Sequence, residues 1–238
     1  MAKMTLDELA AQLSAVYGDG LRAVALYGSA ARGDRLTKNT SLNVLVIVDA
    51  IDMEHLQREA AVTSAWNEAG HPPPLTLTLE EWRGSADIFS MEYADILAHN
   101  KVVLGALPME GIVVKPADLR LQLEHEAMSK LLRLRHGVLS AGGDEKAQRA
   151  LLAGSISSFM TLLRTAVRLA GLEPASDSDA VLTQLEGRTV VDIPAFRRVL
   201  RYSRGDETLD KQGVRDAIKA YLSAATSLVR FANAYVEK

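Results

Sequence analysis

Three residues that follow an apolar run have the types and the spacing to hold a phosphate group. Gly28 and Ser29 come directly after the apolar residues 24–27, and Arg32 follows three positions later. A glycine at the end of a strand lets the backbone turn sharply and approach a ligand closely. The serine offers a hydroxyl and an amide to a phosphate, while the arginine either contacts the phosphate or points into solvent. We predict a nucleotide-binding turn at Gly28, Ser29 and Arg32.

A switch from polar to apolar residues a little further on extends this pattern. Residues 40–46 read Thr-Ser-Leu-Asn-Val-Leu-Val and lead into an apolar strand. With the Gly-Ser turn and Arg32-Gly33, the spacing resembles the DNA polymerase beta-like nucleotidyltransferase superfamily, which includes the aminoglycoside and the minimal nucleotidyltransferases. The pattern of that family is Gly-Ser, then an arginine and often a glycine, then Ser-Asp-x-Asp before an apolar strand. The resemblance covers the N-terminal part of the chain.

The resemblance implies a metal site, and the chain departs from the family at that site. In the family, the two aspartates stand at i and i+2 on the second strand, on one face of the sheet, and hold the Mg²⁺ ions that bind a nucleoside triphosphate. The matching positions here are Ser41 and Asn43. Neither is charged, and Mg²⁺ prefers anionic oxygens. We therefore predict a degenerate metal site with no catalytic residue, and Mg²⁺ as a cofactor only if the site is functional.

Other acids are poorly placed to rescue the metal site. Asp49 has the strand parity of the second metal position but stands six residues on, roughly 20 Å away. Asp34 lies in the loop without a second acid. Catalytic relatives carry a third carboxylate on a later strand, but the strand predicted at 75–79 offers only threonine and leucine. Glu92, on a short strand predicted around 91–93, is the one acid there that could reach the site.

Composition excludes several function classes. The 238 residues include no cysteine, which excludes disulfides, cysteine-ligated zinc and thiol catalysis. The formal net charge of −3 speaks against a nucleic-acid partner. No apolar run approaches the ~18 residues of a membrane span, and the first residues lack the apolar core of a signal peptide. We expect a cytoplasmic protein without a membrane partner.

Periodicity predicts an α+β fold in two domains. Alternating or continuous apolar residues predict strands at 21–27, 42–48, 75–79 and 101–104. Helical spacing predicts helices after Thr5, at 52–69 and, in the second half, at 118–139, 144–170, 178–186, 194–202 and 210–236. In the helix at 52–69 the apolar side is predicted to hold Leu56, Ala60, Thr63 and Trp66. With the resemblance, residues 1–116 form a small mixed β-sheet domain of the nucleotidyltransferase type, and residues 117–238 form an all-α antiparallel helical bundle.

The first bundle helix carries a run of basic residues, namely Lys130, Arg133, Arg135 and His136. Members three apart share a side of the helix, so part of the run could bind phosphates, and the alternative is a solvated helix face. The two longest apolar helices of the bundle permit a homodimer without requiring one.

Three functions follow from these features. The first is a pseudoenzyme, a nucleotidyltransferase-like protein that binds a nucleoside triphosphate or a protein partner without group transfer. The second is an active nucleotidyltransferase that moves a nucleoside monophosphate to a hydroxyl of a small molecule or a protein. The third is a non-enzymatic interaction or structural protein, in which the sheet domain only docks the bundle. The feature that discriminates between them is whether a charge at positions 41 and 43, which Ser41 and Asn43 lack, matters for nucleotide binding.

Overall fold

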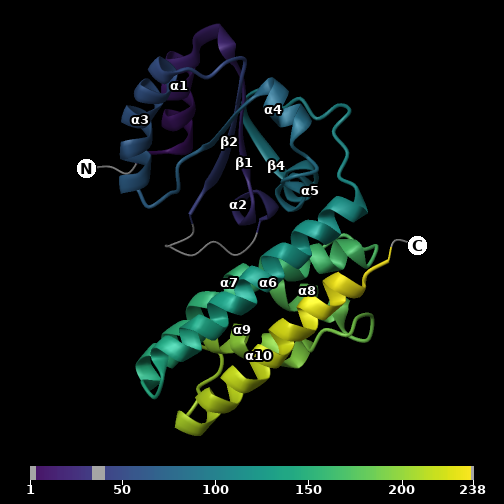
Figure 1. Cartoon of the computed structure of the whole chain (residues 1–238). Helices are drawn as coiled ribbons and strands as arrows, with labels where there is room; N and C mark the ends of the chain where they lie inside the picture. Colours follow the sequence, from purple (N-terminus) through teal and green to yellow (C-terminus); the bar gives the residue numbers. More distant parts are fainter. Residues whose placement is uncertain (1–3, 34–40, 237–238) are drawn as a thin grey trace. The chain divides into compact units, whose positions relative to one another are not determined.

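The structure is a computed structural model that describes residues 4–33 and 41–236 (Figure 1). The chain divides into two compact units, Met1–Lys115 and Pro116–Lys238. We call these the N-terminal unit and the C-terminal unit and describe each by itself.

The N-terminal unit is built on a mixed sheet with the strand order β3-β2-β1-β4. The strands are β1 (Leu21–Tyr27), β2 (Asn43–Val48), β3 (Leu75–Thr78) and β4 (Asn100–Gly105). β1 is antiparallel to both β2 and β4, and β2 is parallel to β3. The strands predicted from apolar alternation are therefore confirmed to within a residue or two.

Helices cover both faces of this sheet (Figure 1). α1 (Leu6–Tyr17) and α3 (Met53–Glu68) pack on the face that carries Val24 and Val46. α4 (Leu79–Gly84) and α5 (Ser90–Ala98) pack on the face that carries Leu45 and Ile47. The apolar β2 strand is buried on both sides, as its continuous apolar sequence predicts. Two short segments, η1 (Gly18–Gly20) and α2 (Ser29–Arg32), flank β1.

Two expectations for this unit are wrong. Residues 90–98 form the helix α5 and not a short strand around 91–93, because the buried residues Tyr93 and Ile96 follow helical spacing. In α3 the buried face holds Glu59, Val62 and Trp66, whereas Leu56 is exposed. The charge of Glu59 conceals this face from a pattern that counts apolar residues.

The C-terminal unit is an all-α bundle, as predicted (Figure 1). Its helices are α6 (Pro116–Ala141), α7 (Glu145–Leu169), α8 (Ser178–Leu185), α9 (Ile193–Arg204) and α10 (Lys211–Ala234). α6 begins at Pro116, so Asp118 lies in its first turn and does not cap it. α7 packs against the other four helices. Phe159 of α7, Phe196 of α9 and Tyr221 of α10 meet in the core, with ring centroids 5.3–5.6 Å apart.

The helix α7 is long and apolar enough, by length and composition, to cross a membrane. However, 56% of its most apolar window is buried inside the structure. A core helix of a globular bundle has the same properties, and α7 has such a core position here.

Buried tyrosines give the fold a measurable dependence on alkaline pH. Burial raises the pKa of Tyr93 to about 12, and burial also raises the pKa of Tyr17 and Tyr221. An unfolded tyrosine ionises near pH 10. The folded state favours the neutral side chains, so their contribution to the free energy of unfolding is fully present below pH ~10 and is lost as the pH rises through ~12. We expect tyrosinate absorbance at pH ~11 from fewer than the six tyrosines of the chain. Tyr93→Phe should leave that absorbance unchanged; ionisation of all six near pH 10 with intact near-ultraviolet circular dichroism would contradict this.

Candidate functional site

The predicted turn lies between the end of β1 and the short helix α2. Gly28 has φ +76° and ψ −151°, a conformation that residues with a side chain rarely adopt. The amides of Ala31 and Arg32 both donate to its carbonyl oxygen at 3.1 Å. A Cβ atom on Gly28 would stand 2.9 Å from Nδ2 of Asn43. Glycine is therefore needed both for the backbone conformation and for the close approach of the Asn43 side chain.

The two positions predicted to match the family's aspartates lie at the start of β2 and just before it. Asn43 is the first residue of β2 and is paired with Tyr27 in the antiparallel register. It shares its face of the sheet with Leu45 and Ile47, which α4 and α5 cover. Ser41 precedes the strand and is exposed. The structure thus places Asn43 directly beside the Gly28 turn.

Arg32 is held by an acid that the sequence analysis did not single out. Its Nη1 donates to both carboxylate oxygens of Asp95, at 2.8 and 2.6 Å. The Arg32 and Asp95 side chains are only 11% and 18% exposed, so the pair is largely shielded from water. A phosphate that approaches Arg32 would have to compete with Asp95 for the guanidinium.

Asp95 comes from α5, in which residues 91–93 were predicted as a short strand. Burial, followed by the charges of Glu92 and Asp95, raises the pKa of Tyr27, which indicates that both acids lie near this end of β1. Glu92 is an exposed residue in the otherwise buried first turn of α5. A helical interpretation of Tyr93 and Ile96 would have put Asp95 one turn beyond Glu92 and would have marked it as a candidate.

Two further carboxylates lie too far from the turn, or on the wrong face, to replace the aspartates. Asp49 follows the opposite end of β2 and accepts a bond from Nε of Arg22 at 2.6 Å. Glu59 accepts bonds from Tyr17 Oη at 2.5 Å and from Thr76 Oγ1 at 2.6 Å. Thr76 pairs with Val46, so this buried acid lies on the sheet face opposite that of Asn43. β3 supplies no third carboxylate.

The donor set at the turn does not fit a pair of Mg²⁺ ions. Ser41 offers a hydroxyl and Asn43 a carboxamide, both neutral, where Mg²⁺ prefers carboxylates. Within residues 4–33 and 41–236, no group of three or more histidine, aspartate or glutamate side chains could hold a metal ion. Asp34, the loop acid considered above, lies outside the described residues.

Comparison with known proteins supports the fold. No family model matches the sequence, and no curated protein matches it. Among solved structures, the crystal structure of spectinomycin adenyltransferase AAD(9) from Enterococcus faecialis with ATP and spectinomycin is similar, with a TM-score of 0.59. The fold is nucleotidyltransferase-like. The alignment covers 92% of this chain and 96% of that chain at 13% sequence identity, so the likeness concerns the fold, and activity depends on the site.

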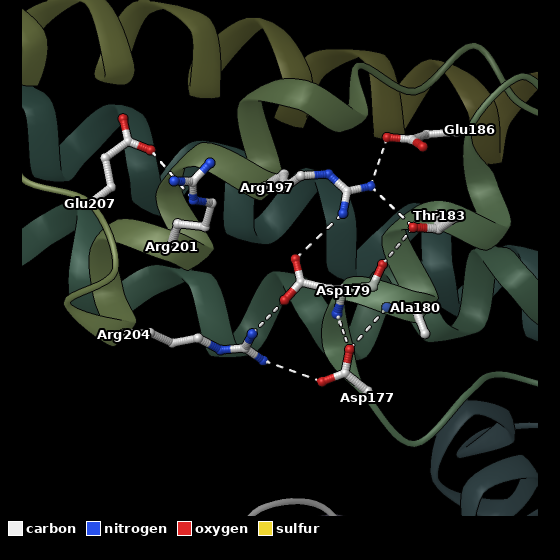
Figure 2. Close-up of polar contacts among 9 residues, drawn as sticks. All are labelled: Asp177, Asp179, Ala180, Thr183, Glu186, Arg197, Arg201, Arg204 and Glu207. Carbon is white, nitrogen blue, oxygen red and sulfur yellow. Dashed lines mark hydrogen bonds and ion pairs between the residues drawn. The ribbon is translucent and has the colours of Figure 1, made fainter.

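The C-terminal unit has its own cluster of charged residues, between α8 and α9 (Figure 2). Arg197 contacts Asp179 at 3.4 Å and Glu186 at 2.7 Å. Arg204 contacts Asp179 at 2.5 Å and Asp177 at 3.9 Å. Asp177 also caps α8 by accepting two backbone bonds. The cluster fastens α8 to α9, with two guanidinium groups against three carboxylates, so it keeps one net negative charge.

Proposed function

We propose that this chain is a pseudoenzyme, a binding protein with a nucleotidyltransferase fold that does not transfer nucleotides. The observation that carries the proposal is the neutral pair Ser41 and Asn43 at the positions of the family's metal-binding aspartates. The position of Asn43 beside the Gly28 turn supports the proposal, because its neutral side chain stands where a metal-binding carboxylate is expected.

The Arg32–Asp95 pair supports the same proposal from the phosphate side. In a transferase, a cation near the turn would attract the triphosphate. Here the guanidinium of Arg32 makes two charge-assisted bonds in a largely buried position. The turn can still offer the Ser29 hydroxyl and backbone amides to a nucleotide without a metal. Binding of that kind is weak, and a protein partner is the other ligand that the proposal includes.

An active adenylyl transferase is the second candidate. It is favoured by the similarity to an enzyme whose structure holds ATP and spectinomycin. It requires carboxylates from the segment around Asp34, outside the described residues, or an approach by Glu92. Transfer would then go from ATP to a hydroxyl of a small molecule.

Calorimetric titration with ATP, first with Mg²⁺ and then with EDTA, tests the proposal. We expect the two titrations to agree, because the site lacks the carboxylates that would bring in the metal. A parallel assay with radiolabelled ATP and spectinomycin should show no adenylylated product. Metal-independent heat would support nucleotide binding at the turn, and no heat in either titration would support the protein partner. Mg²⁺-dependent binding in the micromolar range, about −8 kcal/mol, or any adenylylated product, would overturn the proposal.

A further inference from the structure

A small, partly open pocket lies between α6 and α7 within the C-terminal unit, and its lining combines apolar side chains with a few polar ones. The two helices lie side by side in the bundle (Figure 1). The pocket has a volume of about 190 Å³. Lys130 and Arg133 of α6 and Ser155 and Ser158 of α7 supply its polar groups, and Phe159 belongs to its apolar wall. The pocket lies within one unit, and its two cations come from the basic run of the first bundle helix.

The two cations exceed the negative charge beside them. Lys130 and Arg133 stand three apart and so share a side of α6. Nζ of Lys130 is 3.3 Å from a carboxylate oxygen of Glu126, one turn earlier, and the lysine side chain is 20% exposed. Arg133 has no ion pair within residues 4–33 and 41–236. Lys130, Arg133 and Glu126 together leave one positive charge for an anion.

The serines of α7 give the pocket hydrogen-bond acceptors. Ser155 Oγ donates to the Leu152 carbonyl at 3.2 Å, and Ser158 Oγ donates to the Ser155 carbonyl at 2.8 Å. Ser155 Oγ also lies 3.4 Å from Oη of Tyr221, so the bundle core shares this hydroxyl. The Ser158 hydroxyl hydrogen is engaged within α7, and its oxygen keeps a lone pair for a donor. The pocket thus pairs cationic donors on α6 with neutral acceptors on α7. An anion that itself carries hydroxyl groups satisfies both sides.

Close packing of α6 and α7 limits the size of the ligand. A Cβ atom on Gly137 would lie 2.4 Å from Cδ1 of Leu151, another residue of the apolar wall. The two helices are therefore in tight contact one turn beyond Arg133. A volume of 190 Å³ corresponds to about six waters at ~30 Å³ each. This is below the ~300–1,000 Å³ of pockets for drug-sized ligands, and an entire nucleotide exceeds it.

We propose that the pocket binds a small phosphomonoester, with the phosphate on Lys130 and Arg133 and a ligand hydroxyl on the α7 serines. The proposal does not depend on the Gly28 turn. A nucleotide that binds at the turn and a phosphomonoester that binds between α6 and α7 would affect different units of the chain.

Titration of the full chain with inorganic phosphate and with glycerol 3-phosphate, followed by calorimetry and amide chemical shifts, tests this inference. We expect both ligands to shift amides near residues 130–137 and 151–159. Glycerol 3-phosphate should bind more tightly, because only the ester places a carbon-borne hydroxyl at the serines. Lys130→Met and Arg133→Met should each weaken binding about tenfold, the effect of one charge-assisted hydrogen bond.

Arg135→Met is the matched control, because Arg135, like Arg133, is exposed on this helix but does not line the pocket. It should change affinity less than about twofold at physiological ionic strength, because a charge that does not contact the ligand is largely screened. Circular dichroism of each variant checks that the bundle is folded. If all three variants weakened ligand binding equally, the binding would come from the general positive charge of α6 and not from the pocket. That result would overturn the proposal. Absence of shifts from either ligand in the folded wild-type chain would overturn it as well.

Discussion

The double variant Ser41→Asp, Asn43→Asp should bind ATP more tightly in Mg²⁺ than the wild-type chain does, by at least about 100-fold. Each restored carboxylate adds a charged ligand for the metal, and a hydrogen bond or contact to a charged group contributes about 1.5–3 kcal/mol. The gain should disappear in EDTA, since the carboxylates act through the metal. Isothermal titration of both proteins with ATP measures the difference.

The structure indicates that the two aspartates would fit. Asn43→Asp conserves the size of the side chain that packs against Gly28, and Ser41 is exposed. The charge-free control is Ser41→Asn, which enlarges that side chain without adding a carboxylate. An unchanged affinity in the double variant would show that the Gly28 turn is misaligned for a triphosphate, which favours the interaction-protein alternative. Transfer should stay absent even where binding returns, because β3 carries no third carboxylate.

The strands and most helix ends of this protein could be predicted from local sequence. β2 is six apolar or neutral residues in a row, and Thr5 and Glu8 form the capping box at the start of α1. The candidate site was predictable only in part. Gly28 and Asn43 belong to the same short sequence motif, and in the structure the Asn43 side chain lies against the Gly28 backbone. The Arg32–Asp95 pair joins residues 63 positions apart, and no local periodicity carries such a contact.

The buried carboxylate Glu59 shows why apolar patterns fail at particular positions. A pattern of apolar residues assigns a glutamate to solvent, yet Tyr17 and Thr76 supply hydrogen bonds that make its burial tolerable. The same limitation affects the site. Patterns identify missing aspartates, because they are a matter of residue type, but they do not identify the new partner of Arg32. Both features favour the proposed pseudoenzyme: neutral side chains stand where carboxylates are expected, and the guanidinium near the turn already binds a carboxylate.

Gly105→Ala should destabilise the N-terminal unit by more than about 3 kcal/mol, the upper range for single substitutions with a named cause. Gly105 has φ +73°, and a Cβ atom there would lie 2.1 Å from the carbonyl oxygen of Arg22. That oxygen belongs to the backbone of β1 and accepts the amide of Ala106 at 3.1 Å. It cannot move without disturbing the β1–β4 pairing, in which Gly105 is opposite Ala23. Urea unfolding should show the loss as a lower midpoint.

Gly111→Ala separates the clash from the backbone strain. Gly111 has nearly the same φ, +77°, but an added Cβ would meet no heavy atom of the described residues within 4 Å. Its substitution should cost only about 1–2 kcal/mol, the strain of a left-handed conformation. Tryptophan fluorescence reports on the correct unit, because both tryptophans, Trp66 and Trp82, are in the N-terminal unit. Equal losses in the two variants would mean that the Arg22 carbonyl yields easily, and that this end of the β1–β4 pairing contributes little to the stability of the sheet.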